Sequence, residues 1–201
     1  MLERRSPLAN HKYCAPGTRV GPVGFTETRV RIAERRPISV LQVSAFASST
    51  EDTAGRLATA LAIAPPLPNR WSGSRERNLR HIGPGIWQLV GPEGALPDAA
   101  HLRIDLADVA TVVDLSHART ALQIAGPEAP AVIAKYCGLD LHPAQFPTGG
   151  ATNTRFGHIG MTLARLGEAP TYEMLVFRGY AEFVFDALVE AAREFGLVVA
   201  G

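Results

Sequence analysis

Lysine is almost absent from this sequence of 201 residues. Of the 20 basic residues only Lys12 and Lys135 are lysines, and 19 acidic residues bring the net charge to +1. The basic residues are scattered, whereas a nucleic-acid groove needs a dense basic stripe with interleaved aromatics, so no nucleic-acid partner is expected. The many arginines, together with 19 Gly and 15 Pro, are explained better by the base composition of the genome than by function. Arginine is also common in protein interfaces.

Cysteine and long apolar runs are also scarce. Cys14 and Cys137 stand far apart and neither belongs to a C-x-x-C pair, so a disulfide framework is excluded. The N-terminus, MLERRSPLAN, lacks the apolar run of a secretory signal. No stretch approaches the roughly 18 apolar residues of a membrane span. We therefore expect a cytoplasmic protein with no membrane partner.

Apolar residues are abundant, at 46% of the chain against 19% charged residues, which is enough for one large domain or two small subdomains. Residues 1–24 are the exception, because they are rich in proline and glycine and have no periodic apolar face. This segment is either a frayed tail or an extended arm that lies across a partner. Ordered structure is predicted to begin near Phe25, as one domain over 25–201 with a possible subdivision near 92–110.

Strands and helices follow from local patterns in the remainder. Alternation predicts a strand over 38–46, and Ser49 with Glu51 and Asp52 is typical of a helix start. The predicted helix buries Ala54, Leu57, Ala58 and Leu61 and ends before Pro65. Strands at 78–82 and 86–90 flank the turn Gly83-Pro84-Gly85, and strands at 111–117 and 118–125 follow, as two strands or one bent strand.

The C-terminal half continues the same mixture. Gly126-Pro127-Glu128 opens a helix that Gly138 ends, with a predicted buried stripe of Ala129, Val132, Ile133 and Tyr136. Strands are predicted at 150–156, 158–166 and 171–177. The last helix, 180–195, is predicted to end at Gly196 and to bury Phe183, Val184, Ala187, Leu188 and Ala191. This order predicts an α+β fold, with antiparallel sheets and helices packed on one face.

Motifs that carry chemistry are mostly missing. Neither G-x-G-x-x-G nor G-x-x-x-x-G-K-[ST] occurs, so a nucleotide phosphate cradle is not expected. Cys137 with His142 and His158 is the one imaginable soft-ligand cluster, but structural zinc takes four ligands. Cys137 is better interpreted as a small core residue than as a nucleophile.

Acidic and hydroxyl residues offer two further candidates. Asp114-Leu-Ser116-His117 contains the residue types of a hydrolase triad, but triad members usually come from separate elements, and neighbours on a strand alternate in direction. Asp114 and Ser116 are predicted instead to bond to neighbouring groups at a strand bend. Glu51 and Asp52 belong to a helix start, and Asp105 and Asp108 flank a turn-like segment, so no catalytic, cofactor-binding or metal residue is predicted in this chain.

Four segments carry a resemblance to a known family. Residues 113–129 read VDLSHARTALQIAGPEA, which is similar to a block of the glycine-cleavage T-protein superfamily. CGLDLHPAQFP at 137–147 resembles a more specific stretch of the sarcosine oxidase gamma subunit. IGPGIWQLV at 82–90 and YEMLVFRGYAEF at 172–183 are similar to further segments of that family.

One segment departs from the wider superfamily. In active folate-dependent aminomethyltransferases, the strand after a glycine-rich turn carries an acidic pair that includes the catalytic aspartate. The equivalent stretch here, FGHIGMTLAR at 156–165, has no acidic residue, and Gly160, Met161 or Thr162 cannot stabilise a cationic intermediate. The resemblance therefore implies the fold without the transfer site.

The family resemblance implies a non-catalytic structural gamma subunit of a heterotetramer. Such complexes oxidatively demethylate sarcosine to glycine, with hydrogen peroxide and methylene-tetrahydrofolate as products. FAD, FMN, NAD, zinc and tetrahydrofolate are implied on the alpha, beta and delta subunits, with alpha as the most direct partner and no cofactor on this chain. Alternatives are the equivalent subunit of an N-methylglutamate dehydrogenase, a standalone folate-dependent aminomethyltransferase, or an interaction or tRNA-modification module on the same fold.

Overall fold

The computed structural model describes residues 5–13 and 15–200, and the chain forms two compact units. Unit 1 comprises the described parts of Met1–Arg35, His117–Thr148 and Thr154–Gly201. Unit 2 comprises Arg36–Ser116 and Gly149–Asn153. The chain passes from unit 1 to unit 2 between Arg35 and Arg36, and it returns to unit 1 between Ser116 and His117. Residues 92–110 lie within unit 2.

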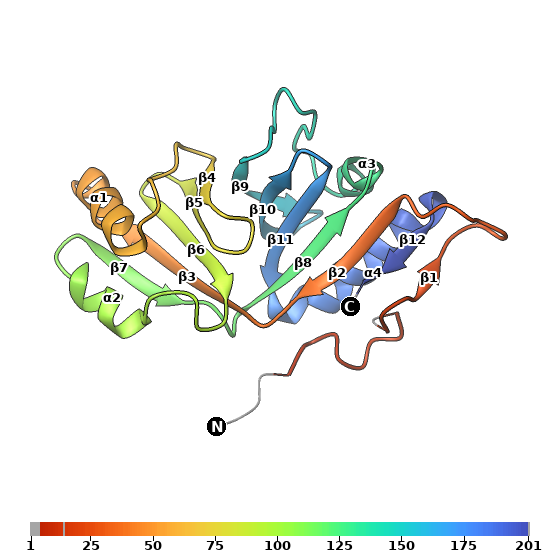
Figure 1. Ribbon diagram of the computed structural model, residues 1–201, viewed down its shortest axis with the longest axis horizontal. Coiled ribbons are helices and arrows are strands. Elements are labelled where there is room, and N and C mark those ends of the chain that lie inside the picture. Colours follow the sequence, from red (N-terminus) through yellow and green to blue (C-terminus); the bar gives the residue numbers. More distant parts are fainter. Residues whose placement is uncertain (1–4, 14, 201) are drawn as a thin grey trace. The chain divides into compact units, whose positions relative to one another are not determined.

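Unit 2 is built on a five-stranded antiparallel sheet with the order β4-β5-β6-β3-β7 (Figure 1). Its strands are β3 (Ile38–Ala45), β4 (Trp71–Gly73), β5 (Asn78–Gly83), β6 (Ile86–Pro92) and β7 (Ala110–Asp114). The strands predicted at 38–46, 78–82 and 86–90 are confirmed. Gly85 has φ +64°, the positive value that the turn between β5 and β6 requires and that glycine adopts without steric cost.

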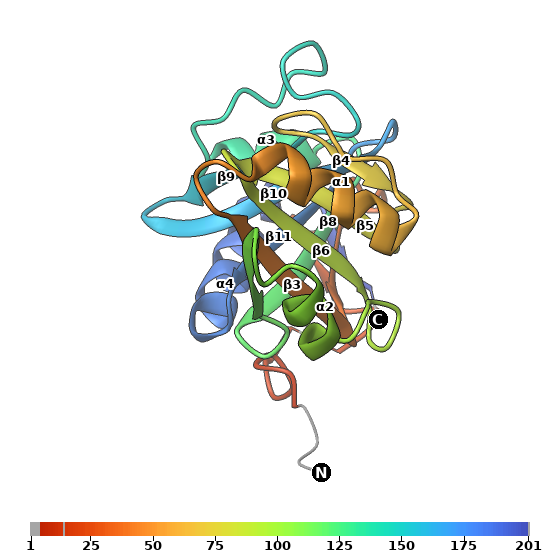
Figure 2. The same cartoon turned by 90° about the vertical axis from the view of Figure 1, so that its left-hand side faces the viewer.

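Two helices cover one face of this sheet, as Figure 2 shows. They are α1 (Thr50–Leu61) and α2 (Ala99–Asp105), and the second was not predicted. Leu57 and Leu61 of α1 and Leu102 of α2 belong to one apolar core with sheet residues such as Trp87. The predicted start of α1 at Ser49 is right, although the Ser49 side chain makes no capping hydrogen bond.

Unit 1 is built on a seven-stranded sheet with the order β1-β12-β2-β8-β11-β10-β9. The strands of this sheet are β1 (Arg19–Val20), β2 (Val30–Arg35), β8 (Arg119–Ala125), β9 (Ala151–Phe156), β10 (Ile159–Gly167), β11 (Thr171–Phe177) and β12 (Leu197–Val199). Of β9, the residues from Thr154 onward belong to unit 1. β12 and β2 are parallel, and β1–β12, β2–β8, β8–β11 and β10–β11 are antiparallel. The strands predicted over 111–125 are two strands of different sheets, β7 and β8. The α+β prediction is confirmed.

The helices of unit 1 correct two predicted burial patterns. α4 (Ala181–Ala192), between the short 3-10 turns η1 (Arg178–Tyr180) and η2 (Arg193–Phe195), buries Val184, Phe185 and Leu188, whereas Phe183 is 52% exposed. α3 (Ala129–Ala134) ends before Tyr136, which is 37% exposed, so neither Tyr136 nor Gly138 has its predicted role. These aromatic residues are therefore surface residues.

The described part of the N-terminal segment packs on unit 1. Leu8 is 1% exposed within the core, and Tyr13 and Val20 pack against that core. Ser6 Oγ donates to Glu34 Oε2 at 2.5 Å, and β1 pairs with β12. Cys14 lies outside the described residues. Among the described parts, ordered contacts therefore begin well before Phe25.

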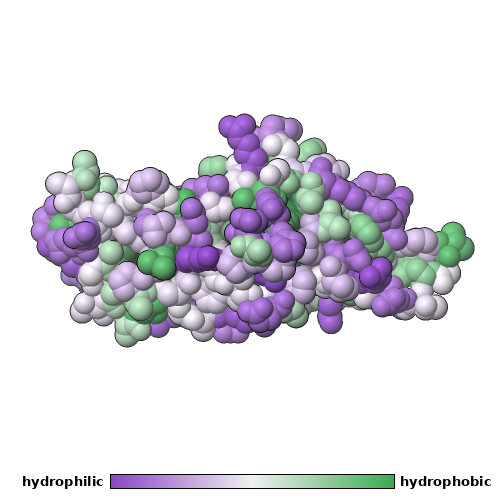
Figure 3. All heavy atoms as spheres, turned by 90° about the horizontal axis from the view of Figure 1, so that it is seen from above, coloured by the Kyte–Doolittle hydropathy of each residue, from purple (hydrophilic) through white to green (hydrophobic). Residues whose placement is uncertain are grey.

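The surface of the chain is of mixed polarity. Figure 3 shows hydrophilic and hydrophobic residues intermingled on the face seen from above. Among the described residues, no helix combines the length and the apolar character that crossing a bilayer requires.

Candidate functional site

Asp114 and Ser116 form a turn that ends β7. Asp114 Oδ1 accepts a hydrogen bond from the Ser116 backbone N–H at 2.8 Å, and Ser116 Oγ accepts one from the Val40 N–H at 2.9 Å. Both side chains therefore satisfy neighbouring backbone groups, as the sequence predicts. The Ser116 hydroxyl lies 2.9 Å from a backbone donor of β3, and His117 is exposed.

Cys137, His142 and His158 have separate environments. Cys137 is 3% exposed in the core of unit 1, with its Sγ 3.6 Å from Thr154 Oγ1. His142 is exposed and accepts a hydrogen bond from the Ala144 N–H at its Nδ1. His158 is exposed, with its ring centroid 6.1 Å from that of Phe183. No group of three potential ligands is gathered anywhere in residues 5–13 and 15–200.

The loop that follows Cys137 is shaped by its own side chains. Asp140 Oδ1 accepts a hydrogen bond from the His142 N–H at 2.9 Å, and the His142 carbonyl accepts from the Phe146 N–H. Leu141 and Phe146 are buried, and the Phe146 carbonyl accepts from Nη1 of Arg165 at 3.0 Å. The acidic and imidazole groups of this stretch therefore fix a loop conformation.

Three aspartates of unit 2, Asp52, Asp105 and Asp108, contact Arg56 on α1. Its guanidinium donates to Asp52 at 3.0 Å and to Asp108 at 2.8 Å, and it also reaches the Asp105 carbonyl. These hydrogen bonds hold the pKa of Asp108 below its usual value and raise that of Arg56. A cavity of about 590 Å³ between α1 and α2 lies beside this cluster, lined by Asp52, Arg56 and Leu106 among others. Of the cavity's acidic residues, Asp52 is bonded to Arg56 through its carboxylate and Asp105 through its backbone carbonyl.

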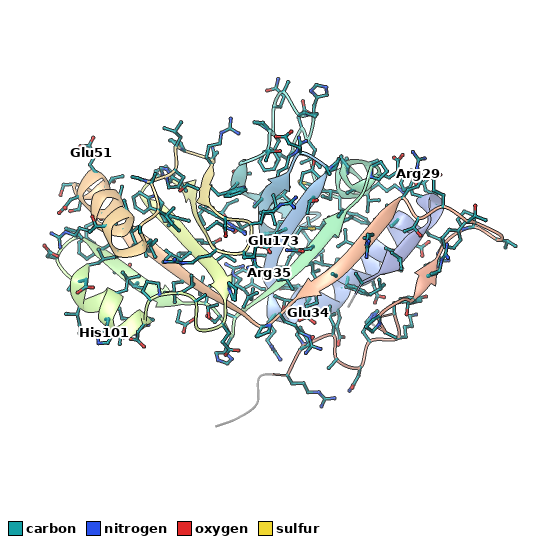
Figure 4. All side chains as sticks on the ribbon, in the orientation of Figure 1. Arg29, Glu34, Arg35, Glu51, His101 and Glu173 are labelled. Atoms are coloured by element: carbon teal, nitrogen blue, oxygen red, sulfur yellow. The ribbon has the colours of Figure 1, made fainter. Side chains whose placement is uncertain are left out.

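A buried carboxylate that sequence reasoning missed lies in the sheet of unit 1. Glu173 on β11 is fully buried, and its Oε2 accepts from Nη1 of Arg35 at 2.9 Å and from Nε2 of Gln123 at 3.1 Å. Figure 4 shows Arg35 and Glu173 lying next to each other on the sheet. Because Tyr172 and Met174 face the core, alternation places Glu173 on the opposite face. The three residues link β2, β8 and β11.

Comparison with known proteins supplies the family. A model of the GCVT N-terminal domain matches residues 87–201. The sarcosine oxidase subunit gamma of Corynebacterium sp. (strain P-1) is 34% identical over 199 residues, which cover 96% of this chain and 91% of that protein. That of Arthrobacter sp. is 31% identical over 166 residues, or 78% of this chain and 81% of that protein. The chain belongs to the sarcosine oxidase gamma subunit family.

Solved structures agree with this assignment. A chain of the heterotetrameric sarcosine oxidase from Corynebacterium sp. U-96, in complex with pyrrole 2-carboxylate, matches with a TM-score of 0.79 and 29% identity, over 94% of each chain. Aminomethyltransferase T of the glycine cleavage system from Bartonella henselae matches with a TM-score of 0.67 and 17% identity, over 99% of this chain and 60% of that one. This chain thus has a fold similar to part of the glycine-cleavage T-protein.

Strand β10 of this gamma subunit family member is the stretch where that superfamily's acidic pair is expected. It contains Gly160, which is exposed, followed by the buried Met161 and Thr162, and no carboxylate. Glu173, which pairs with Ala164 of this strand, is already bonded to Arg35 and Gln123.

Proposed function

We propose that this chain is the structural gamma subunit of a heterotetrameric, flavin-dependent complex of the sarcosine oxidase type. The similarity to sarcosine oxidase gamma subunits over 96% of the chain carries this proposal. The reaction of the complex is the oxidative demethylation of sarcosine or a related N-methyl amine. Alpha, beta and delta subunits are the proposed partners, and FAD, FMN, NAD, zinc and tetrahydrofolate are proposed to lie on them.

A role without a catalytic group is supported by how the polar residues are used. The carboxylates and hydroxyl of Asp114, Ser116 and Glu173 bond to backbone or to partner side chains within their own unit. Strand β10 has no acid to stabilise a developing cation, which an aminomethyltransferase needs at this position. In this proposal the chain provides a binding surface for other subunits and stabilises the complex, and other subunits bind and oxidise the substrate.

The proposal is tested by affinity purification of the tagged chain from the cells in which it naturally occurs, followed by identification of the proteins recovered with it. We expect a stable complex that contains flavin and produces hydrogen peroxide from sarcosine, with turnover expressed per flavin. N-methylglutamate, assayed in parallel with an artificial electron acceptor, distinguishes the dehydrogenase-type complex. A tagged chain that recovers no flavoprotein partner would contradict the proposal.

The matched control replaces polar groups in this chain within the assembled complex. Turnover per flavin is expected to remain within about twofold of wild type, because none of these groups is predicted to contact the reacting atoms. A hundredfold loss of turnover with assembly and flavin content intact would show that this chain supplies a catalytic group. The variants are Cys137→Ala, His117→Ala, His142→Ala and His158→Ala.

A further inference from the structure

Three exposed aromatic side chains follow one another where β11 leads through η1 into α4. Phe177 is 45% exposed, Tyr180 50% and Phe183 52%. His158 lies beside Phe183, with 6.1 Å between ring centroids, and Arg119 lies over Phe177, with its guanidinium carbon 3.6 Å from the ring centroid. We call these five residues the arginine–aromatic surface. Aromatic residues and arginine are the types that dominate the energetics of protein interfaces.

Among the residues that the structure describes, no carboxylate forms an ion pair with Arg119. Its Nε atom is buried and has no hydrogen-bond partner among the residues that the structure describes. Burial also lowers the pKa of its guanidinium. A buried donor without a partner is unusual in native proteins. Because the Arg119 residue as a whole is only partly buried, an acceptor from outside this chain can pair with the rest of its guanidinium.

The charges around this surface indicate the chemistry of that acceptor. Arg178 adds a second cation, and its guanidinium donates to the Arg5 carbonyl. On α4, Asp186 is already paired with His11, and Glu182 stands in the first turn of the helix. A carboxylate forms the strong, charge-assisted hydrogen bonds that a guanidinium stacked on an aromatic ring favours.

We propose that the arginine–aromatic surface is where a larger subunit of the heterotetramer docks, with a carboxylate of that subunit bonded to Arg119 and apolar side chains covering the aromatic residues. This inference rests on the proposed function. A second copy of this chain is a poorer occupant, because a two-fold contact through this surface would bring two Arg119 cations together.

The test co-expresses the tagged partner subunits with wild-type or variant chains and measures how much of this chain is recovered with them. Arg119→Glu and Phe183→Ala are expected to lower recovery at least about tenfold, because central aromatic and arginine residues carry most of the energy of an interface. The matched controls are Arg75→Glu and Ile104→Ala, since Arg75 is exposed and Ile104 is 73% exposed, both in unit 2. The controls are expected to be recovered like wild type.

A second measurement does not depend on variants. Hydroxyl-radical footprinting of the complex and of the separated chain is expected to show at least about threefold slower oxidation of Phe177, Tyr180 and Phe183 in the complex, because docking removes them from water. Raising the salt concentration should weaken recovery of wild type more than that of Arg119→Met, since salt screens a charge pair.

The outcomes separate this inference from the proposed function. The docking surface is overturned if Arg119→Glu and Phe183→Ala are recovered with the partners as well as wild type is and the footprints do not change. In that case the proposed function stands, because the wild-type chain still binds its partners. Recovery of a homodimer that Arg119→Glu dissociates assigns the surface to a second copy and also overturns the inference. Absence of any partner with wild type overturns both.

Discussion

Breaking the buried pair between Arg35 and Glu173 should cost this protein a large part of its stability. Glu173 is fully buried and the Arg35 side chain is only 15% exposed, so Glu173→Ala leaves a desolvated guanidinium without its carboxylate. Removing one partner of a buried pair typically costs about 3–5 kcal/mol. A chain of this kind has a total stability of about 5–15 kcal/mol, so the change consumes a substantial fraction.

The measurement is urea unfolding followed by pulse proteolysis, which works at low protein concentration. With a denaturant dependence of about 2 kcal/mol per molar urea, the midpoint is expected to fall by about 1.5–2.5 M. The double change Arg35→Met with Glu173→Gln removes both charges and keeps an acceptor for Gln123. It should therefore cost less than about 2 kcal/mol.

The exposed pair Arg193–Glu190 is the matched control. Its side chains are 50% and 65% exposed, so Glu190→Ala should cost less than about 1 kcal/mol because water screens such a pair. If Glu173→Ala changes the midpoint no more than Glu190→Ala does, the carboxylate does not stabilise the sheet and the reasoning fails.

Three other expectations concern helices and assembly. Leu188→Ala, a fully buried change, should cost about 2–5 kcal/mol and lower the yield of assembled complex while turnover per flavin stays normal, as activity after size-exclusion purification would show; a fall in turnover per flavin would refute this. Asp98→Ala should lower the melting temperature at pH 7, because Asp98 Oδ1 accepts from two backbone N–H groups of α2, whereas Asp98→Asn should retain the cap. The hydrogen bonds from the backbone N–H groups of His101 and, second, Ala100 lower the pKa of Asp98. The stability that Asp98 contributes is therefore present above its ordinary pKa of 3.8 and is lost as the pH falls below that value. If the loss of stability in Asp98→Ala persists unchanged at pH 2, this reasoning is refuted. Expressed alone, the chain should aggregate at the concentrations used for chromatography and be rescued by co-expression, and a monodisperse monomer in size-exclusion chromatography would count against this.

The extent to which sequence predicts this fold depends on how local each signal is. The positions of β3, β5, β6, β9, β10 and β11 are predicted well, because local apolar patterns and flanking turns mark them. β2 has the sequence VRIAER, with several charged residues, and is stabilised by pairing with β8 and β12 from far along the chain. β12 has only three residues. Such long-range pairing leaves no local pattern to detect.

The burial of α4 shows a different limit. Its apolar residues offer two stripes at helical spacing, one through Phe183 and Ala187 and another through Phe185 and Val189. Both satisfy the helical period, and only the position of the sheet decides between them, in favour of Phe185 and Val189. Periodicity therefore predicts the helix but not which of two equally apolar faces is buried.

Among the candidate functional residues, too, local interactions are predictable from sequence and long-range ones are not. The turn at Asp114 and Ser116 is predictable because its hydrogen bonds are local. Glu173 stands in an apolar strand, which is an unusual place for an acid and could have signalled a buried partner. The identity of that partner, Arg35, 138 residues away, depends on the order of strands in the sheet.

The way the chain is divided between the two units determines which unit can fold first during translation. All the helices and the main strands of unit 2 lie in one continuous stretch, Arg36–Ser116, so its sheet can assemble while the ribosome is still working on the second half. Unit 1 uses the first strands and the last, because β2 pairs with β8 and β12 and β1 pairs with β12. β2 can pair with β8 once residues 119–125 have emerged, but β1 and the edge of β2 that faces β12 must wait for the final residues. During that interval the nascent chain carries unpaired strand edges near its amino end, where a chaperone or an early partner would find them.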